Sequence, residues 1–283
     1  RNLQCLYRSK NKGEKMTEKN EKREMTEEKV TKKTELGKKE STAIVTAAIA
    51  FEEDAGSGLE NLTAEDLTIP RLKILQALSP EVNKRDGKYI ENSAAGDITN
   101  TVTKELFTED EGCVVLPVAY RRMFLEWQPR ENGGGLVKQH SDPNILSQTT
   151  KDAKGADVLA NGNYIQTSAT HYGLVVNGDS YQQVMIPMAG TQLKKSRTWN
   201  SVMASIKVKS STGKVFTPPS YSHKYKLTTV AESNDRGTWF GWNIVLAGVL
   251  SDDEMFLYEA AKHFAGSINF DKSFGSVESE APF

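Results

Sequence analysis

Alternation of apolar and polar residues is the dominant pattern in the second half of the chain. The stretch CVVLPVAYRRMFLEW (113–127) carries apolar residues on even positions up to Val118 and on odd positions from Met123. Strict alternation predicts a strand with one buried face. Because a one-residue slip moves every side chain to the other face, the change of phase predicts a bulge near Tyr120–Arg122.

Further strands follow the same period. HYGLVV and YQQVMIPM flank Asn177-Gly178, a strong signal for a hairpin turn. YSHKYKLTTV (221–230) and TWFGWNIVLAGV (238–249) alternate again, and the second stretch sends Trp239 and Trp242 to opposite faces. We expect Trp242 to lie in the core.

The period changes to that of a helix in TQLKKSRTWNSVMASI (191–206). Its apolar residues are spaced i, i+3, i+4, i+7, which predicts a helix that begins at a Thr191 cap. The core stripe is Trp199, Val202, Met203 and Ile206. Lys194 and Arg197 fall on the opposite side of this helix.

Two more segments carry helical signals. Residues 61–82 predict a short helix capped by Thr63, with Leu72, Leu75 and Leu78 as core residues. After it, GDITNTVTKELF (96–107) reads as a hairpin. A closing helix begins with the capping box of Ser251 and Glu254 and buries Leu257, Ala261, Phe264 and Ile268.

These elements predict a mainly β fold with helices. Five strands, with a helix between the third and fourth, follow the order of an OB-like five-stranded barrel. In that fold oligonucleotides cross strands two and three, between the first long loop (128–168) and the turn at 231–237. The expected organisation is a disordered N-terminal arm (1–58), an α+β acidic extension packed on the barrel (59–112), the barrel (113–250), a C-terminal helix (251–268) and a mobile acidic tail (269–283).

Charge is segregated along the chain, although the formal net charge is only −1. Residues 41–112 carry a net charge of −8 and residues 113–231 a net charge of +8. From Ser180 to Ala231 the chain contains no acidic residue and eight basic ones. A solvated surface usually mixes both signs, so this block favours a polyanion site.

The two termini and the cysteines bear on where the protein acts. The apolar run TAIVTAAIAF (42–51) follows a segment with too many acids for a secretory signal. KGEKM (12–16) is what a ribosome-binding site before a start codon would encode, so we expect translation to start at Met16 and residues 1–15 to be upstream sequence. Cys5 and Cys113 are too few for a disulfide framework, which favours a reducing cytoplasm.

Motifs of catalysis are missing from the sequence. It has no phosphate-binding P-loop, no H-E-x-x-H, no paired CxxC and no G-x-S-x-G, and its four histidines are scattered singly. We expect no catalytic residue, no metal and no cofactor.

The ending ESEAPF (278–283) resembles the tip of bacterial and phage single-stranded DNA-binding proteins. The segments IPRLKILQALSPEV, GDITNTVTKELF and VVLPVAYRRMFLEW also resemble proteins of tailed phages that are supposed to bind single-stranded DNA. The resemblance implies an OB-fold, no membrane association, and a mobile tail that recruits replication and recombination enzymes in the infected host cytoplasm. Its partner-binding residues would be Glu278, Glu280, Pro282 and Phe283.

We therefore expect a sequence-tolerant single-stranded DNA-binding protein, with RNA open as an alternative ligand. Bases would stack on Trp239, Phe124 and Tyr172. For Trp239 exposure and burial are equally compatible with the pattern, whereas for the other two rings it favours burial beneath a loop. Phosphates would contact the basic side chains of Lys194, Arg197, Lys224 and Lys226. The nucleic-acid site would also include Arg236, beside Trp239, and Arg122, which points outward with Phe124.

Two alternatives remain at this stage. A virion structural protein would suit the repetitive β-structure, but neither the single basic block nor the free tip. A nuclease would need clustered acids to hold a metal, where this chain has lysines.

Overall fold

The computed structural model describes residues 54–62, 66–235 and 237–268. The chain divides into two compact units, residues 1–63 and 64–283. In the first unit the described residues form turns, such as the one closed by the bond from the Ser57 N–H to the Asp54 carbonyl (3.0 Å). The second unit is mostly β with few helices, which confirms the predicted class.

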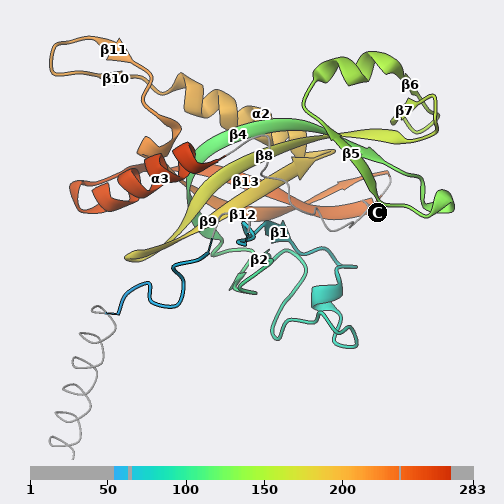
Figure 1. Ribbon diagram of the computed structural model, residues 1–283, viewed down its shortest axis with the longest axis horizontal. Helices are drawn as coiled ribbons and strands as arrows, with labels where there is room; N and C mark the ends of the chain where they lie inside the picture. The colour runs from blue at the N-terminus through green and yellow to red at the C-terminus, as the bar shows by residue number, and fades with distance from the viewer. Residues whose placement is uncertain (1–53, 63–65, 236, 269–283) are drawn as a thin grey trace, which may run out of the picture. The chain divides into compact units, whose positions relative to one another are not determined.

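A curled, antiparallel eight-stranded sheet organises the second unit (Figure 1). Each of its longer strands carries the alternating pattern recognised in the sequence. In spatial order the strands are β13 (Gly237–Val249), β12 (His223–Asn234), β4 (Cys113–Trp127), β8 (Tyr164–Asn177), β7 (Asp157–Leu159) and β6 (Thr149–Lys151), with β5 (Leu136–His140) beside β4 and β9 (Ser180–Ala189) beside β8.

Strands β4 and β8 are long enough to belong to two regions. β12 pairs with the start of β4, at Cys113–Val115, and β5 pairs with its end, at Phe124–Trp127. Between them the register against β8 shifts between Pro117 and Ala119. The predicted bulge is therefore present, slightly earlier in the strand than the phase change suggested.

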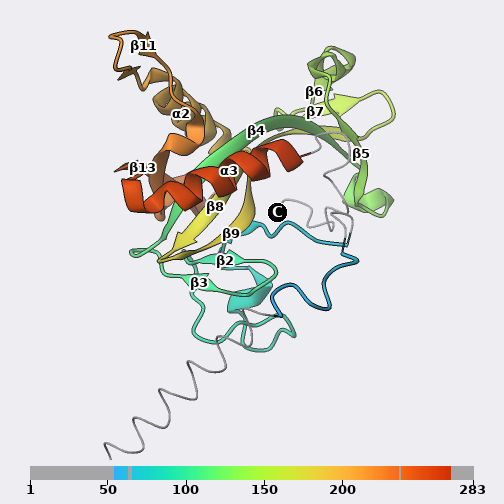
Figure 2. The same cartoon turned by 60° about the vertical axis from the view of Figure 1, so that its left-hand side comes forward.

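Two apolar cores lie on opposite faces of the sheet. The inner core gathers Val115, Ile186, Trp199 and Trp242 inside the curl. The other core lies beneath α3 (Met255–Ser267), which crosses the outer face of β4 and β8 in Figure 2. Both faces of β4 are covered, because alternate side chains of one strand serve different cores.

A capping box and an ion pair fix the start of α3. The short 3₁₀ turn η5 (Asp252–Glu254) precedes the helix, and the reciprocal Ser251–Glu254 bonds of the predicted capping box are present. Glu254 also pairs with Lys224 on β12. The bond from Lys224, with those from Ser251, lowers the pKa of Glu254 to about 2. The carboxylate that ends the loop thus also joins the helix to the sheet.

The segment after β4 is more ordered than its polar, glycine-rich sequence predicted. It contains β5, β6, β7 and the 3₁₀ turns η2 (Arg130–Asn132) and η3 (Pro143–Gln148). Its polar centre is the buried Glu126, which accepts bonds from Asn163 (2.6 Å), His140 (2.8 Å) and Asn161 (3.3 Å). These donors, led by Asn163, lower the pKa of Glu126. One satisfied carboxylate therefore ties the end of β4 to β5 and to the turn before β8.

The predicted helix over residues 61–82 is wrong. Thr63 lies outside the described residues, and the later part forms β1 (Leu72–Ile74) and the 3₁₀ turn η1 (Pro80–Val82). Leu72 and Leu75 are buried as expected, but Leu78 is 79% exposed. The segment extends along the sheet, where hydrogen bonds to strand edges are available, and this outweighs its helical spacing.

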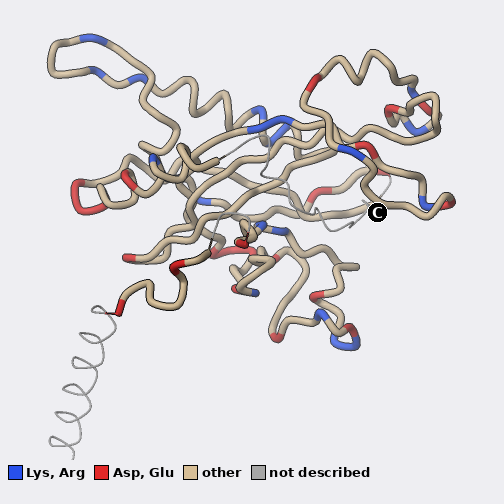
Figure 3. The backbone as a smooth tube through the Cα atoms, in the orientation of Figure 1, with Lys and Arg blue, Asp and Glu red and all other residues tan. Residues whose placement is uncertain are grey.

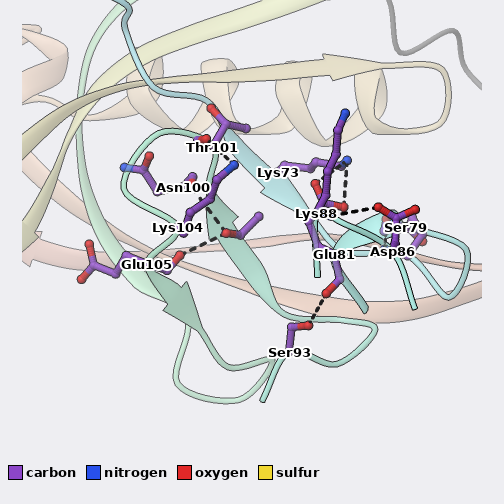
Figure 4. Close-up of polar contacts among 12 residues, drawn as sticks. Lys73, Ser79, Glu81, Asp86, Lys88, Ser93, Asn100, Thr101, Lys104 and Glu105 are labelled. Atoms are coloured by element: carbon purple, nitrogen blue, oxygen red, sulfur yellow. Dashed lines mark hydrogen bonds and ion pairs between the residues drawn. The ribbon is translucent and has the colours of Figure 1, made fainter. Parts of the chain in front are cut away.

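The predicted hairpin that follows is confirmed. β2 (Ile98–Asn100) and β3 (Leu106–Phe107) pair with each other, and β2 also pairs with β1. Figure 4 shows the polar contacts that brace this extension. Lys73 pairs with the buried Glu81 at 3.0 Å, and the Ser93 hydroxyl donates to the Glu81 carbonyl at 2.7 Å.

The two edge strands of the curled sheet, β9 and β13, are bridged by other segments instead of pairing directly. Within the described residues β9 and β13 do not pair; instead the Met185 N–H of β9 donates to the Pro70 carbonyl (2.8 Å). On β13, the Gln76 side chain accepts from the Phe240 N–H (2.8 Å) and donates to its carbonyl (3.0 Å). The next N–H on that edge, Trp242, donates to the Gln192 side chain (2.9 Å).

The predicted helix is α2 (Gln192–Ser205), and a short hairpin follows it. Trp199 is buried, but Thr191 makes no side-chain capping bond, so the predicted cap is wrong. β10 (Val208–Lys209) and β11 (Val215–Phe216) form a separate two-stranded sheet, and η4 (Ser220–Ser222) leads into β12. None of the helices in the described residues is long and apolar enough to cross a membrane.

Replacing Gln76 with alanine should lower the free energy of unfolding by about 1–2 kcal/mol, because the Phe240 N–H and carbonyl lose their partners. Urea denaturation followed by circular dichroism measures the change. Gln183→Ala is the matched control, since Gln183 is exposed on β9. Equal effects of the two substitutions would contradict the assigned role of Gln76.

Candidate nucleic-acid interface

A groove of about 980 Å³ lies between α2 and β13. Helix α2 supplies Lys194, Lys195 and Arg197, all from the acid-free block. The strand supplies backbone and side chains from Trp242 to Leu246. A smaller pocket of about 260 Å³, which is lined by Arg71 and Gln76, also reaches Trp242. This groove is thus lined by part of the basic block.

The helical period separates charged from apolar residues on α2. Lys194 and Arg197 are one turn apart and exposed, whereas Trp199 and Ser196 are buried against the sheet. Gln192 pins the start of the helix to the Trp242 N–H. The two exposed cations therefore line a groove whose helical wall is held to β13 by a bond from a backbone N–H to a side chain.

Glu232 is the carboxylate among the groove residues. Its Oε1 pairs with Lys195 at 2.9 Å, and its Oε2 accepts from the Trp239 indole N–H at 2.9 Å. The Lys195 bond, reinforced by Trp239, lowers the pKa of Glu232. Lys195 is therefore neutralised locally, while Lys194 and Arg197 form no ion pair within the described part of the chain.

Gly241 makes this arrangement sterically feasible. A Cβ atom at this position would lie 2.8 Å from both Gln192 Nε2 and Glu232 Oε2. The two side chains approach the strand backbone closely because no side chain stands there.

Aromatic rings form the floor of the groove and the core beneath it. Trp199, Trp242 and Tyr225 line it, and Trp199 stacks on His171 with ring centroids 4.3 Å apart. Burial lowers the pKa of His171 to about 3, and its Nε2 lies 2.8 Å from the Ser196 hydroxyl. The predicted core placement of Trp199 and Trp242 is confirmed, since each is 2% exposed.

Two rings proposed for base stacking are buried. Phe124 is 1% exposed and packs with Ile145 and Ile165, because the loop segment folds over that end of β4. Tyr172 is fully buried in the core beneath α3. The same helix covers the outer face of β4 and β8. The path of an oligonucleotide across the second and third predicted strands stays a prediction.

The proposed phosphate contacts separate into different places. Lys194 and Arg197 line the groove, and Trp239 joins it through Glu232. Lys224 is paired with Glu254, so its charge is compensated. Lys226 is exposed and does not line the groove, although its cross-strand partner Val245 does.

The remaining proposed residues do not join the groove. The Arg122 guanidinium lies 5.3 Å from the Phe124 ring centroid, on the distal part of β4. Arg236 lies outside the described residues, as does the tail with Glu278, Glu280, Pro282 and Phe283.

The described residues contain no cluster of side chains that indicates catalysis or metal binding. No group of three or more His, Cys, Asp or Glu side chains there could hold a metal ion. Burial raises the pKa of the Cys113 thiol to about 12, so its thiolate is not accessible at neutral pH.

Sequence reasoning missed Lys195, Glu232 and Gln192. Lys195 belonged to the acid-free block, and Glu232 is the first acid after it, so a search for the nearest acid would have suggested their pairing. No periodic pattern in the sequence indicates that the Gln192 side chain bonds the edge of β13.

The family described as "Pam3 phage gp34-like protein" matches residues 38–272. No curated protein matches the chain, and no solved structure does.

We expect Trp242→Ala to cost about 3–5 kcal/mol of stability, because it removes a buried ring that touches α2 and the sheet. Trp239→Ala should cost much less, since that ring is half-buried and its indole N–H donates one bond, to Glu232. Chemical denaturation of both variants measures the difference. The alternation assignment fails if Trp239→Ala is the more destabilising change.

Proposed function

The chain belongs to the Pam3 phage gp34-like protein family, and we propose that it is a phage protein that binds single-stranded DNA without sequence preference. The observation that carries the proposal is the groove between α2 and β13, with Lys194 and Arg197 exposed at its rim. Such binding needs a positively charged groove that follows the sugar–phosphate backbone of the nucleic acid.

Local electrostatics favours a polyanion as the ligand. Lys194 and Arg197, which form no ion pair among the described residues, and the Lys195–Glu232 pair leave the groove lining with a net positive charge. The α2 side of the groove belongs to the stretch from Ser180 to Ala231 that contains no acid, and the one acid in the lining, Glu232, is paired with Lys195. An anionic strand meets little repulsion there.

The order of the strands supports an OB-like barrel. The strands predicted as first to fifth are β4, β8, β9, β12 and β13, and they lie side by side as β9-β8-β4-β12-β13. Helix α2 follows the third, and the barrel is open between β9 and β13. OB-folds are partly open Greek-key barrels that commonly bind oligonucleotides.

A role in phage DNA replication or recombination, in the cytoplasm of the infected host, follows from this proposal. The protein would protect single strands without catalysis. The wide sequence tolerance comes from contacts to phosphates, which carry no sequence information.

Titration with oligo-dT at several salt concentrations tests the proposal. The parent protein should bind with a steep salt dependence, and Lys194→Ala and Arg197→Ala should each lower the log–log slope by about 0.7 unit for each phosphate contact removed.

Lys226→Ala is the matched control, because it removes the same charge from the same basic block at an exposed residue that does not line the groove. It should leave the slope unchanged. A salt-independent parent, or equal losses in all three variants, would refute a site in the groove.

We further propose that the C-terminal tip recruits a replication or recombination enzyme. Support comes from the sequence: Glu278 and Glu280 precede Pro282 and the terminal Phe283. A terminal carboxylate beside an aromatic ring suits capture in a basic-rimmed pocket.

Deletion of residues 276–283 should leave the melting temperature and oligo-dT affinity nearly unchanged, with slightly tighter binding at low salt. It should abolish association with the cognate polymerase or recombination enzyme, and Phe283→Ala alone should lose most of it. Pull-down and calorimetry measure these effects. A lowered melting temperature would show that Phe283 packs on the protein's own surface instead.

A further inference from the structure

The hairpin after α2 extends away from the sheet in Figures 1 and 2. We call residues 207–217 the basic arm. Its strands pair only with each other, as Val208 with Phe216 and Lys209 with Val215. Phe216 is 42% exposed and Val215 60%.

Local bonds alone shape this arm. The Ser210 N–H donates to the Lys214 carbonyl (2.9 Å), and Gly213 closes the turn with φ of 84°. At its base the Lys207 ammonium donates to the Ala204 carbonyl (3.2 Å) and to the Thr217 hydroxyl. A lone two-stranded ribbon is marginal in water. An arm that is shaped in this way but buries little apolar surface is suited to contact with another molecule.

Charge indicates which molecule that is. Lys207, Lys209 and Lys214 lie in the arm, and the acid-free block surrounds it in sequence. Lys209 and Lys214 form no ion pair within the described part of the chain. Figure 3 shows basic residues along the hairpin. Charge complementarity therefore favours a polyanion over a protein partner.

Strand pairing places an aromatic ring and a lysine on one face. Val208 and Phe216 are directly opposite each other and share a face. Lys214 is two residues before Phe216 and falls on the same face, because side chains alternate along a strand. An aromatic ring beside an ammonium group is the combination on which single-stranded bases stack while their phosphates are bound.

Helix α2 connects the arm to the groove. The exposed Lys194 and Arg197 lie in its first half, and the arm begins just after Ser205, where it ends. At 1.5 Å per residue, Lys194 and Lys207 are about 20 Å apart along this direction. The groove cations and the lysines of the basic arm thus lie at opposite ends of α2, with no basic residue from position 198 to 206 between them.

We propose that the basic arm is a second contact for the strand held in the groove. Phe216 stacks a base, and Lys209 and Lys214 bind phosphates, so the arm lengthens the footprint beyond the groove. This inference rests on the proposed single-stranded DNA-binding function.

The test compares oligo-dT of about six nucleotides, enough for the groove, with one of about thirty. Phe216→Ala should weaken binding of the long oligonucleotide roughly fivefold or more, the loss expected for one stacked base, and leave the short one unchanged. Joint replacement of Lys209 and Lys214 by alanine should lower the salt slope by about 1.4 units on the long oligonucleotide only.

Phe216→Leu is the control, because it keeps apolar bulk and removes the π-face. It should weaken binding as Phe216→Ala does. Unchanged binding of the long oligonucleotide by Phe216→Ala overturns the proposal. A second result would also overturn it: Phe216→Leu binds the long oligonucleotide like the parent, while Phe216→Ala disrupts self-association in light scattering. The arm would then be an interface between copies of the chain.

The groove and the arm can fail separately. If Lys194→Ala weakens both oligonucleotides and the arm variants weaken neither, the proposed function stands and the arm inference falls. A parent protein that binds neither oligonucleotide overturns the proposed function, and the arm inference with it.

Discussion

The unpaired edge of β13 is the constraint on which the rest of the second unit depends. Backbone N–H and carbonyl groups that face a core must find partners. Two glutamines supply them: Gln76 serves both groups of Phe240, and Gln192 serves the Trp242 N–H. Side-chain amides stand in for a neighbouring strand, and the sheet can curl without closing on itself.

This solution also creates the groove. Because Gln192 is the first residue of α2, its bond to Trp242 sets the start of the helix beside β13. Lys194 and Arg197 follow Gln192 within one and a half helical turns, so the Gln192–Trp242 bond also determines their positions relative to β13. Gly241 leaves room for Gln192 and Glu232 to approach the backbone. A closing strand at this edge would fill the space that α2 now borders.

Periodicity in the sequence predicted the elements in which apolar residues are regularly spaced along a buried face. It identified β4, β8, β9, β12 and β13, helix α2 and the capping box of α3, because local pattern and final packing agree there. It failed for residues 61–82, whose leucines are spaced like a helix but whose backbone is needed at the sheet edges. The sequence pattern favoured burial of Phe124 beneath a loop, which is confirmed, but the polar, glycine-rich residues 128–163 carry no periodic signal for β5, β6 and β7.

The acid-free block shows what the charge composition of a segment can and cannot predict about a binding site. Its composition indicated a polyanion region, yet packing gave its lysines different roles. Lys224 is paired with the carboxylate that caps α3, Lys195 with Glu232, and Lys226 is exposed but does not line the groove. Only a residue whose charge is both exposed and uncompensated can attract a strand, since a paired ammonium must first give up its partner. Within the groove that condition selects Lys194 and Arg197, and beyond α2 it selects the lysines of the basic arm. The two sets lie at either end of one helix, which is the geometry that a chain of phosphates, rather than a compact anion, can use.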